Sequence, residues 1–166
     1  MNEALTAWIR AGEHGDAEAA RVALADDAVL VSPLTDQFVF RGRDEVVDLL
    51  RDVFEVVTAI RYVRTERVES GAVLFAETRV DGLVMNEAQF VDLDAEGRIA
   101  AVTLFMRPLP ASTRFLRRLG PRVARRQGNT GVARTLTLAG ALLDSVAASG
   151  DRTFVPMAAP TRTRRG

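Results

Sequence analysis

Few side chains in this sequence could do acid–base or nucleophilic chemistry. Cysteine is absent, histidine occurs once, and every basic residue among the 166 is Arg, because the chain contains no Lys. These absences exclude Schiff-base lysines, thiolate nucleophiles, disulfides and cysteine zinc sites. We expect no metal site and no cofactor. The groups that remain are carboxylates, amides, hydroxyls, one Tyr and one Trp.

If the chain catalyses a reaction, a carboxylate is expected to carry it. Glu87 lies two residues before Gln89 in a predicted strand, so the two side chains share one face. Burial of that face would raise the pKa of Glu87 toward a value that suits a general base. Glu77, on the preceding predicted strand, is the second candidate. Either carboxylate could instead pair with an Arg or reach solvent.

Helical spacing and turn signals predict the elements that position these groups. Helices are expected over 3–13 and 17–24, followed by short strands over 28–32 and 38–40. A longer helix after Gly42 has an apolar face made of Val46, Leu50, Val53, Phe54 and Val57. From Ile60 to Arg107, four β-rich runs are separated by turn residues at 70–71, 81–82 and 94–97. The order predicts an α+β fold, in which a cone-shaped, curved antiparallel sheet wraps around the long helix.

Charge divides the chain into two parts. Through Met106, 10 Arg stand against 20 Asp plus Glu, net −10, whereas from Arg107 onward 12 Arg stand against two Asp, net +10. We therefore expect a pocket domain over 1–110, an Arg-rich helical extension packed on it over 111–150, and a partly disordered tail over 151–166.

The extension has the pattern of two helices. In the first, Phe115, Leu116, Leu119 and Val123 form an apolar stripe, and Gly120-Pro121 is expected to break or kink the helix. The second, over 132–148, is expected to bury Leu136, Ala139, Leu142, Leu143 and Val146. The apolar segment 154–157 is expected to dock in an extended form.

Three roles are open for the arginines of the first of these helices. They could pair with the acidic body of the same chain or of a dimer partner, bind nucleic acid, or bind an anionic membrane. Nucleic acid is disfavoured because no reader motif or stacking aromatics accompany the arginines. A membrane is disfavoured by Gly120-Pro121, and no apolar run approaches 18 residues, so a cytoplasmic location is expected. The candidate anion-binding residues are Arg117, Arg118, Arg122, Arg125 and Arg126.

The stretch from Gly15 to Gly42 resembles the entry to a nuclear-transport-factor-2-like domain, closest to the SnoaL-like and ketosteroid-isomerase-like branch. The resemblance covers about residues 3–107. It implies two short helices that lead into the first strand of a conical pocket, and it implies a homodimer. It does not imply one reaction, because members of this superfamily differ in function.

Three positions of the resemblance depart from ketosteroid isomerase. The isomerase motif Ala-Asp-Asp-Ala-Thr-Val-Glu-Asp-Pro resembles residues 25–33 without a gap, and this puts Ser32 where the isomerase has its catalytic Asp. By spacing from Asp16, Trp8 takes the place of the oxyanion tyrosine. By counting back from Gly97, Gln89 takes the place of the protonated Asp. Ketosteroid isomerase chemistry is therefore not expected.

The residues at these positions suit a binding site better. Trp8, Ser32 and Gln89, together with Phe54 and Tyr62, are expected to line a pocket for a small, largely apolar molecule. The alternative is a closed core in which the indole and the amide satisfy each other. Two further functions stay open: a cyclase, isomerase or hydrolase-type enzyme for a polyketide-like or terpenoid-like substrate, and an interaction protein that acts through the Arg-rich helix.

Overall fold

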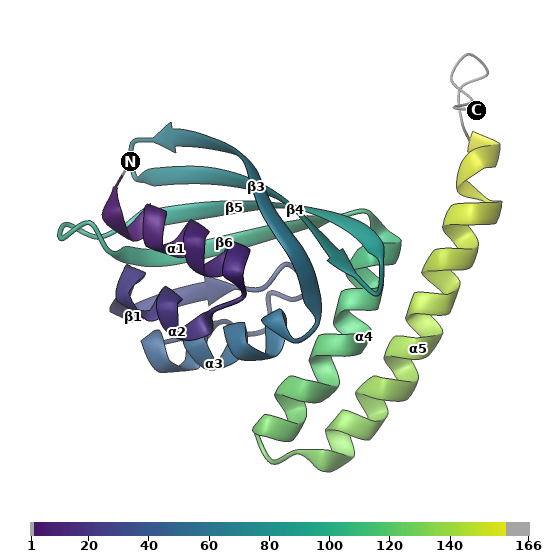
Figure 1. The fold of residues 1–166 in the computed structure, drawn as a ribbon. Helices are drawn as coiled ribbons and strands as arrows, with labels where there is room; N and C mark the ends of the chain where they lie inside the picture. Colours follow the sequence, from purple (N-terminus) through teal and green to yellow (C-terminus); the bar gives the residue numbers. More distant parts are fainter. Residues whose placement is uncertain (1, 159–166) are drawn as a thin grey trace.

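The computed structural model describes residues 2–158, which form a curved sheet covered on one face by helices (Figure 1). Helices α1 (Glu3–His14) and α2 (Ala17–Ala20) and the 3-10 turn η1 (Arg21–Ala23) lead into strand β1 (Leu24–Val31). The chain then forms β2 (Phe40–Arg41), α3 (Arg43–Phe54) and the strands β3 (Val57–Val68), β4 (Gly71–Val80), β5 (Leu83–Leu93) and β6 (Ile99–Arg107). Two long helices, α4 (Leu109–Arg126) and α5 (Thr130–Thr153), and the turn η2 (Val155–Ala158) complete it.

Local capping explains where the first helices begin and end. The Asn2 side chain accepts a hydrogen bond from the backbone N–H of Leu5, and Gly15 ends α1 in the left-handed conformation at φ 65°. Asp16 caps α2, because its carboxylate accepts the N–H of Ala19. The second predicted helix is shorter than expected, since its last turn tightens into η1 and β1 already begins at Leu24.

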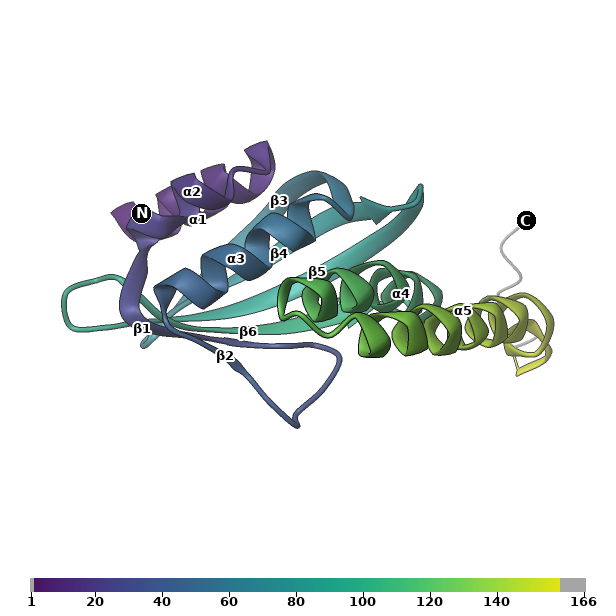
Figure 2. The same ribbon diagram turned by 90° about the horizontal axis from the view of Figure 1, so that it is seen from below.

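The strands lie in the order β2-β1-β6-β5-β4-β3. The predicted meander is confirmed, because β3 to β6 pair antiparallel with their neighbours in sequence. The sheet is not antiparallel throughout, since β1 pairs parallel with β6. Helices α1 and α3 cover the concave face (Figure 2), so the α+β cone predicted from the sequence is confirmed.

Helix α4 lies across the open end of the cone, and α5 packs against the outer side of α4 (Figures 1 and 2). The predicted break at Gly120-Pro121 is wrong, because α4 continues through Pro121. The fixed φ of proline is helical, and only the backbone hydrogen bond to Arg117 is lost. Packing against α5 supports this part of the helix: Gly120 lies against Leu136, and Gly140 lies against the backbone of Arg117.

The burial expected for α5 is wrong for Ala139, Leu142, Leu143 and Val146, which are exposed, whereas Leu136 is half-buried. Its buried face consists of Ala133, Gly140, Asp144 and Ala147, whereas Leu142 and Val146 are 69% and 61% exposed. Small residues allow α5 to approach α4 closely, and the larger apolar residues face outward. The segment 154–157 does not dock in an extended form but makes the exposed turn η2. The rest of the expected tail, 159–166, lies outside the described residues.

The expected homodimer stays a prediction. The convex face of the sheet carries an edge-to-face pair, Phe90 and Phe105, with ring centroids 5.5 Å apart. Their exposed fractions are 47% and 55%. A second copy of the chain could cover this pair.

The close approach at Gly140 generates a prediction for stability. A Cβ atom at this position would lie 3.0 Å from the Cα of Arg117, so Gly140→Leu should force α4 and α5 apart. We expect the free energy of unfolding, measured by urea titration, to fall by about 1–3 kcal/mol. The matched control is Gly131→Leu in the same helix, where an added Cβ meets nothing within 4 Å. Equal stability of the two variants would contradict the close packing.

Candidate functional site

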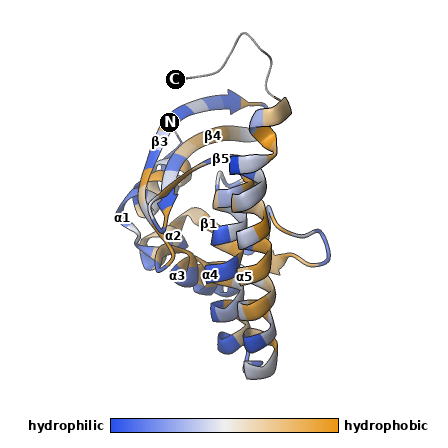
Figure 3. Cartoon of the chain, turned by 90° about the vertical axis from the view of Figure 1, so that its right-hand side faces the viewer, coloured by the Kyte–Doolittle hydropathy of each residue, from blue (hydrophilic) through white to orange (hydrophobic). Residues whose placement is uncertain are grey.

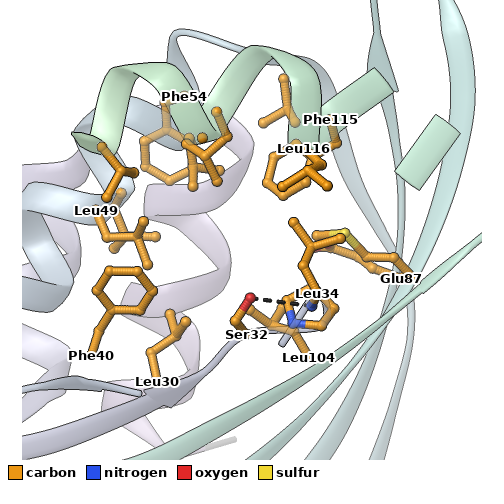
Figure 4. Close-up of a pocket in the computed structure, with 18 of the residues that line it drawn as sticks. Leu30, Ser32, Leu34, Phe40, Leu49, Phe54, Glu87, Leu104, Phe115 and Leu116 are labelled. Carbon is orange, nitrogen blue, oxygen red and sulfur yellow. Dashed lines mark hydrogen bonds between the residues drawn. The ribbon is translucent and has the colours of Figure 1, made fainter. Parts of the chain in front are cut away.

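The concave side of the sheet encloses a cavity of about 450 Å³ between α1, α3, α4 and the strands. Its walls are mostly aliphatic and aromatic. Figure 4 shows Leu30, Phe40 and Leu49 on one side and Phe115 and Leu116 of α4 on another. The interior therefore contains a cavity, although the indole of Trp8 and the amide of Gln89 do bond to each other, as the closed-core alternative expected.

Helix α4 supplies a wall that the sequence did not assign to the site. Its apolar stripe, Phe115, Leu116, Leu119 and Val123, lines the cavity, and Val132 and Leu136 of α5 contribute to the same wall. Periodicity indicated the stripe, but only the position of α4 across the open end of the cone gives the stripe this role. The loop after β1 adds Pro33, Leu34 and Phe38.

All five residues expected to contact a ligand line the cavity: Trp8, Ser32, Phe54, Tyr62 and Gln89. They do not form one group. Ser32 lies in the loop after β1, where its hydroxyl oxygen accepts the N–H of Leu34 at 3.2 Å (Figure 4). This local bond holds the turn. The hydroxyl therefore offers one donor to the cavity and has no adjacent base to activate it.

A hydrogen-bonded cluster joins Trp8 of α1, Tyr62 of β3 and Gln89 of β5. The indole N–H of Trp8 donates to Gln89 Oε1 at 2.8 Å, and the Tyr62 hydroxyl donates to the same oxygen at 3.4 Å. The amide nitrogen of Gln89 donates to Glu87 Oε1 at 2.6 Å. Trp8 and Gln89 are each only 4% exposed. This connected network fixes the amide orientation and leaves the second carboxylate oxygen of Glu87 for another partner.

Burial sets the protonation of this cluster. It raises the pKa of Glu87 above its ordinary value, while the hydrogen bond from Gln89 lowers that pKa by less. Burial also raises the pKa of Tyr62, and the nearby Glu87 adds to the effect, so the phenol remains a donor. Glu87 is the only carboxylate among the described residues that line the cavity.

The second candidate carboxylate, Glu77, lies outside the cavity, which corrects its choice as a site residue. Glu77 pairs with Asn86 across the β4–β5 ladder, whereas Glu87 pairs with Ala76. Because side chains alternate along a strand, this register puts Glu77 and Glu87 on opposite faces of the sheet. Glu77 is bonded to Arg61 at 2.6 Å on the convex side.

The candidate anion-binding arginines are mostly occupied by carboxylates of the same chain. Arg117 donates to Asp144 of α5, Arg118 to Asp81 of the β4–β5 turn, and Arg126 pairs with Asp52 of α3. Arg122 and Arg125 have no ion-pair partner among residues 2–158, and they line a surface groove beside Arg117 and Arg118. Arg118 and Arg126 therefore pair with the acidic body, the first of the roles considered from the sequence, whereas Arg117 pairs within the extension itself.

The family follows from a comparison of the sequence with known domains. The SnoaL-like domain family matches residues 5–107, from α1 to the end of β6. The chain belongs to the SnoaL-like family. No curated protein is similar enough to this SnoaL-like protein to count as a relative.

Solved structures share the fold. An uncharacterised bacterial protein with a cystatin-like fold from Silicibacter pomeroyi is similar with a TM-score of 0.71 at 22% identity, over 80% of this chain and 95% of that one. A steroid delta-isomerase from Pseudomonas aeruginosa is similar at 0.67 and 24% identity, over 75% and 92%. An epoxide hydrolase/cyclase-like enzyme, SalBIII, which acts in pyran ring formation in the polyether salinomycin, is similar at 0.54 and 17% identity, over 63% and 88%. At these identities the likeness extends to the fold and not to the chemistry.

The raised pKa of Glu87 predicts a pH-dependent stability. The unfolded carboxyl has the ordinary value of 4.5 and the folded one titrates higher, so between these values the folded chain binds a proton that the unfolded chain has lost. The contribution of Glu87 to stability is therefore complete below pH 4.5 and decreases as the pH rises through the raised pKa. Relative to wild type, Glu87→Gln should become more stable with rising pH. Denaturant titrations of both proteins from about pH 4 to about pH 8 measure this difference. Parallel curves would show that the carboxyl is not buried.

Proposed function

We propose that this SnoaL-like protein binds a small, largely apolar molecule in the cavity. The observation that carries the proposal is the distribution of polarity in a cavity of about 450 Å³. Its walls are apolar except for a few groups, and the strongest of these meet at Glu87, Gln89 and Tyr62. Binding sites for small molecules typically combine an apolar surface with a few placed polar groups.

The polar cluster limits what the ligand can present. The Gln89 oxygen already accepts two hydrogen bonds, so the groups left for a ligand are the second oxygen of Glu87, the second N–H of the Gln89 amide and the lone pairs of the Tyr62 hydroxyl. A protonated Glu87 can donate to a carbonyl or ether oxygen, and an ionised one can accept from a hydroxyl. One or two such groups on an otherwise apolar skeleton would satisfy the cluster.

Trp8 provides the readout for this proposal, because it is the only Trp in the chain and lines the cavity. The neutral apolar dye N-phenyl-naphthylamine should bind saturably, gain emission and quench Trp8 by energy transfer. Leu116→Arg puts a charge into the apolar wall and should weaken binding about tenfold or more. The control is Val22→Arg at a position that is 76% exposed and outside the cavity. Non-saturable dye binding, or equal effects of the two substitutions, would count against the cavity as the site.

A second candidate function is an enzyme of the cyclase, isomerase or hydrolase type, acting on a polyketide-like or terpenoid-like substrate. The buried Glu87 favours it, because burial raises the pKa of this carboxyl and a raised pKa suits a general acid or base better than the ordinary one. Two fold relatives, described as a steroid isomerase and an epoxide hydrolase/cyclase-like enzyme, make such chemistry compatible with the fold. The interaction protein acting through the Arg-rich helix has weaker support, since only Arg122 and Arg125 of the proposed set lack a partner among the described residues.

The enzyme hypothesis has its own test. Mass spectrometry of molecules retained through purification would supply the substrate class to assay. With such a substrate, Glu87→Gln should lower kcat by about 10²–10⁴ and change KM little, because the amide keeps the shape but cannot transfer the proton. Dye binding by the same variant verifies that the cavity is intact. Turnover at the wild-type rate would reject Glu87 as the base.

A further inference from the structure

Helix α5 exposes an apolar face along its length. The outer face of α5, as we call it, has large aliphatic side chains and no charged residue: Leu138, Leu142, Leu143 and Val146. Leu138 is 75% exposed and Leu142 is 69% exposed. The turn η2 extends this surface with Phe154, Val155 and Met157, which are also exposed. Figure 3 shows this hydrophobic stretch on the side of the molecule that α5 forms.

The contacts of α5 explain why this face is free. Among the described elements, α5 packs extensively only on α4 and η2. Its buried carboxylate Asp144, with a side chain 3% exposed, accepts hydrogen bonds from Arg114 at 2.7 Å and Arg117 at 2.9 Å. These bonds fix the polar side of α5 toward α4. The opposite side of the helix is therefore the outer face, and no element of residues 2–158 covers it.

Charge distinguishes between the possible occupants of the outer face. The extension from Arg107 onward contains 12 Arg and two Asp, and one of these two, Asp144, is buried and neutralised. A symmetric contact between the α5 helices of two copies would bring two positively charged extensions together, which is unfavourable. An anionic bilayer offers the opposite charge and an apolar layer below it.

We propose that α5 docks on the surface of an anionic membrane, with its outer face in the interfacial layer. Arg134 and Arg152 lie on α5 itself, and Arg122 and Arg125 lie on the adjoining helix without an ion-pair partner among residues 2–158. None of these four has an ion-pair partner in the described part of the chain, so lipid phosphates are the partners we propose for them. A membrane was disfavoured from the sequence because Gly120-Pro121 was expected to interrupt the basic helix. Since α4 is continuous through Pro121, the interruption of the basic helix no longer argues against a membrane.

The helix is expected to lie on the bilayer and not to cross it. By length and composition alone, the segment from Thr130 to Ala158 is long and apolar enough to span a membrane, and 22% of its most apolar stretch is buried in the protein. However, the doubly bonded Asp144 ties the middle of α5 to two arginines of α4. Crossing would bring these charges into hydrocarbon or break the pairs, and both are costly. Docking in the plane keeps them at the protein side of the helix.

Vesicle sedimentation of the full-length protein tests this proposal. Wild type should sediment with vesicles of equal parts phosphatidylglycerol and phosphatidylcholine, and much less with phosphatidylcholine alone or at high salt. The double variant Leu138→Asp/Leu142→Asp should lower the affinity for the anionic vesicles about tenfold or more. Because both positions are exposed, circular dichroism should show an unchanged fold. Val22→Asp, at a 76% exposed site on η1, is the matched control and should bind like wild type.

Three outcomes would overturn the proposal. The first is a wild-type protein that stays in the supernatant with anionic vesicles. The second is a double variant that sediments as well as wild type. The third is light scattering that finds wild type to be a dimer and the double variant a monomer, which would assign the outer face to a second copy of the chain. Docking does not depend on an occupied cavity, so dye binding can fail while vesicle binding succeeds.

Discussion

Helix α4 packs against the cone on one side and against α5 on the other, and the cavity and the position of α5 both depend on these contacts. Its apolar stripe closes the open end of the cone, while its arginines form ion pairs with Asp81 and Asp52 of the body and with Asp144 of α5. Exposed ion pairs contribute little individually. The pairs on Asp144 differ, because that carboxylate is buried and would be costly without its partners. One helix thus shapes the cavity and anchors α5.

The polar groups discussed for the cavity form two separate hydrogen-bonded sets. In the first set, the Ser32 hydroxyl accepts a hydrogen bond from its own loop. In the second, Trp8 and Tyr62 donate to Gln89, and the Gln89 amide donates to Glu87. Because the Gln89 oxygen already accepts two hydrogen bonds, this amide is suited to orienting Glu87 and not to reacting itself. Glu87 is left as the group through which this end of the cavity interacts with a ligand, whether by binding or by proton transfer.

Membership of the SnoaL-like family explains the architecture and leaves the chemistry to individual positions. Ser32, Trp8 and Gln89 stand where the resemblance to ketosteroid isomerase implies an acid, a phenol and another acid, and none of the three can take over those roles directly. The cone is retained, and the one carboxylate that lines its cavity among the described residues is Glu87, two residues from Gln89 on the same face of β5. The fold restricts where a ligand lies more than what happens to it.

The sequence by itself determined the α+β cone, the capped first helices, the meander and the shared face of Glu87 and Gln89. These features depend on short-range periodicity and turn chemistry, which neighbouring residues encode directly. Only the tertiary structure decided that Glu77 faces outward, that α4 continues through Pro121, and that α5 buries its small residues and exposes Leu138 and Leu142. A one-residue difference in register separates Glu77 from Glu87, and contacts between α4 and α5 outweigh local propensity at Gly120 and Gly140. Such outcomes depend on which residues distant in sequence meet, and no local pattern carries that information.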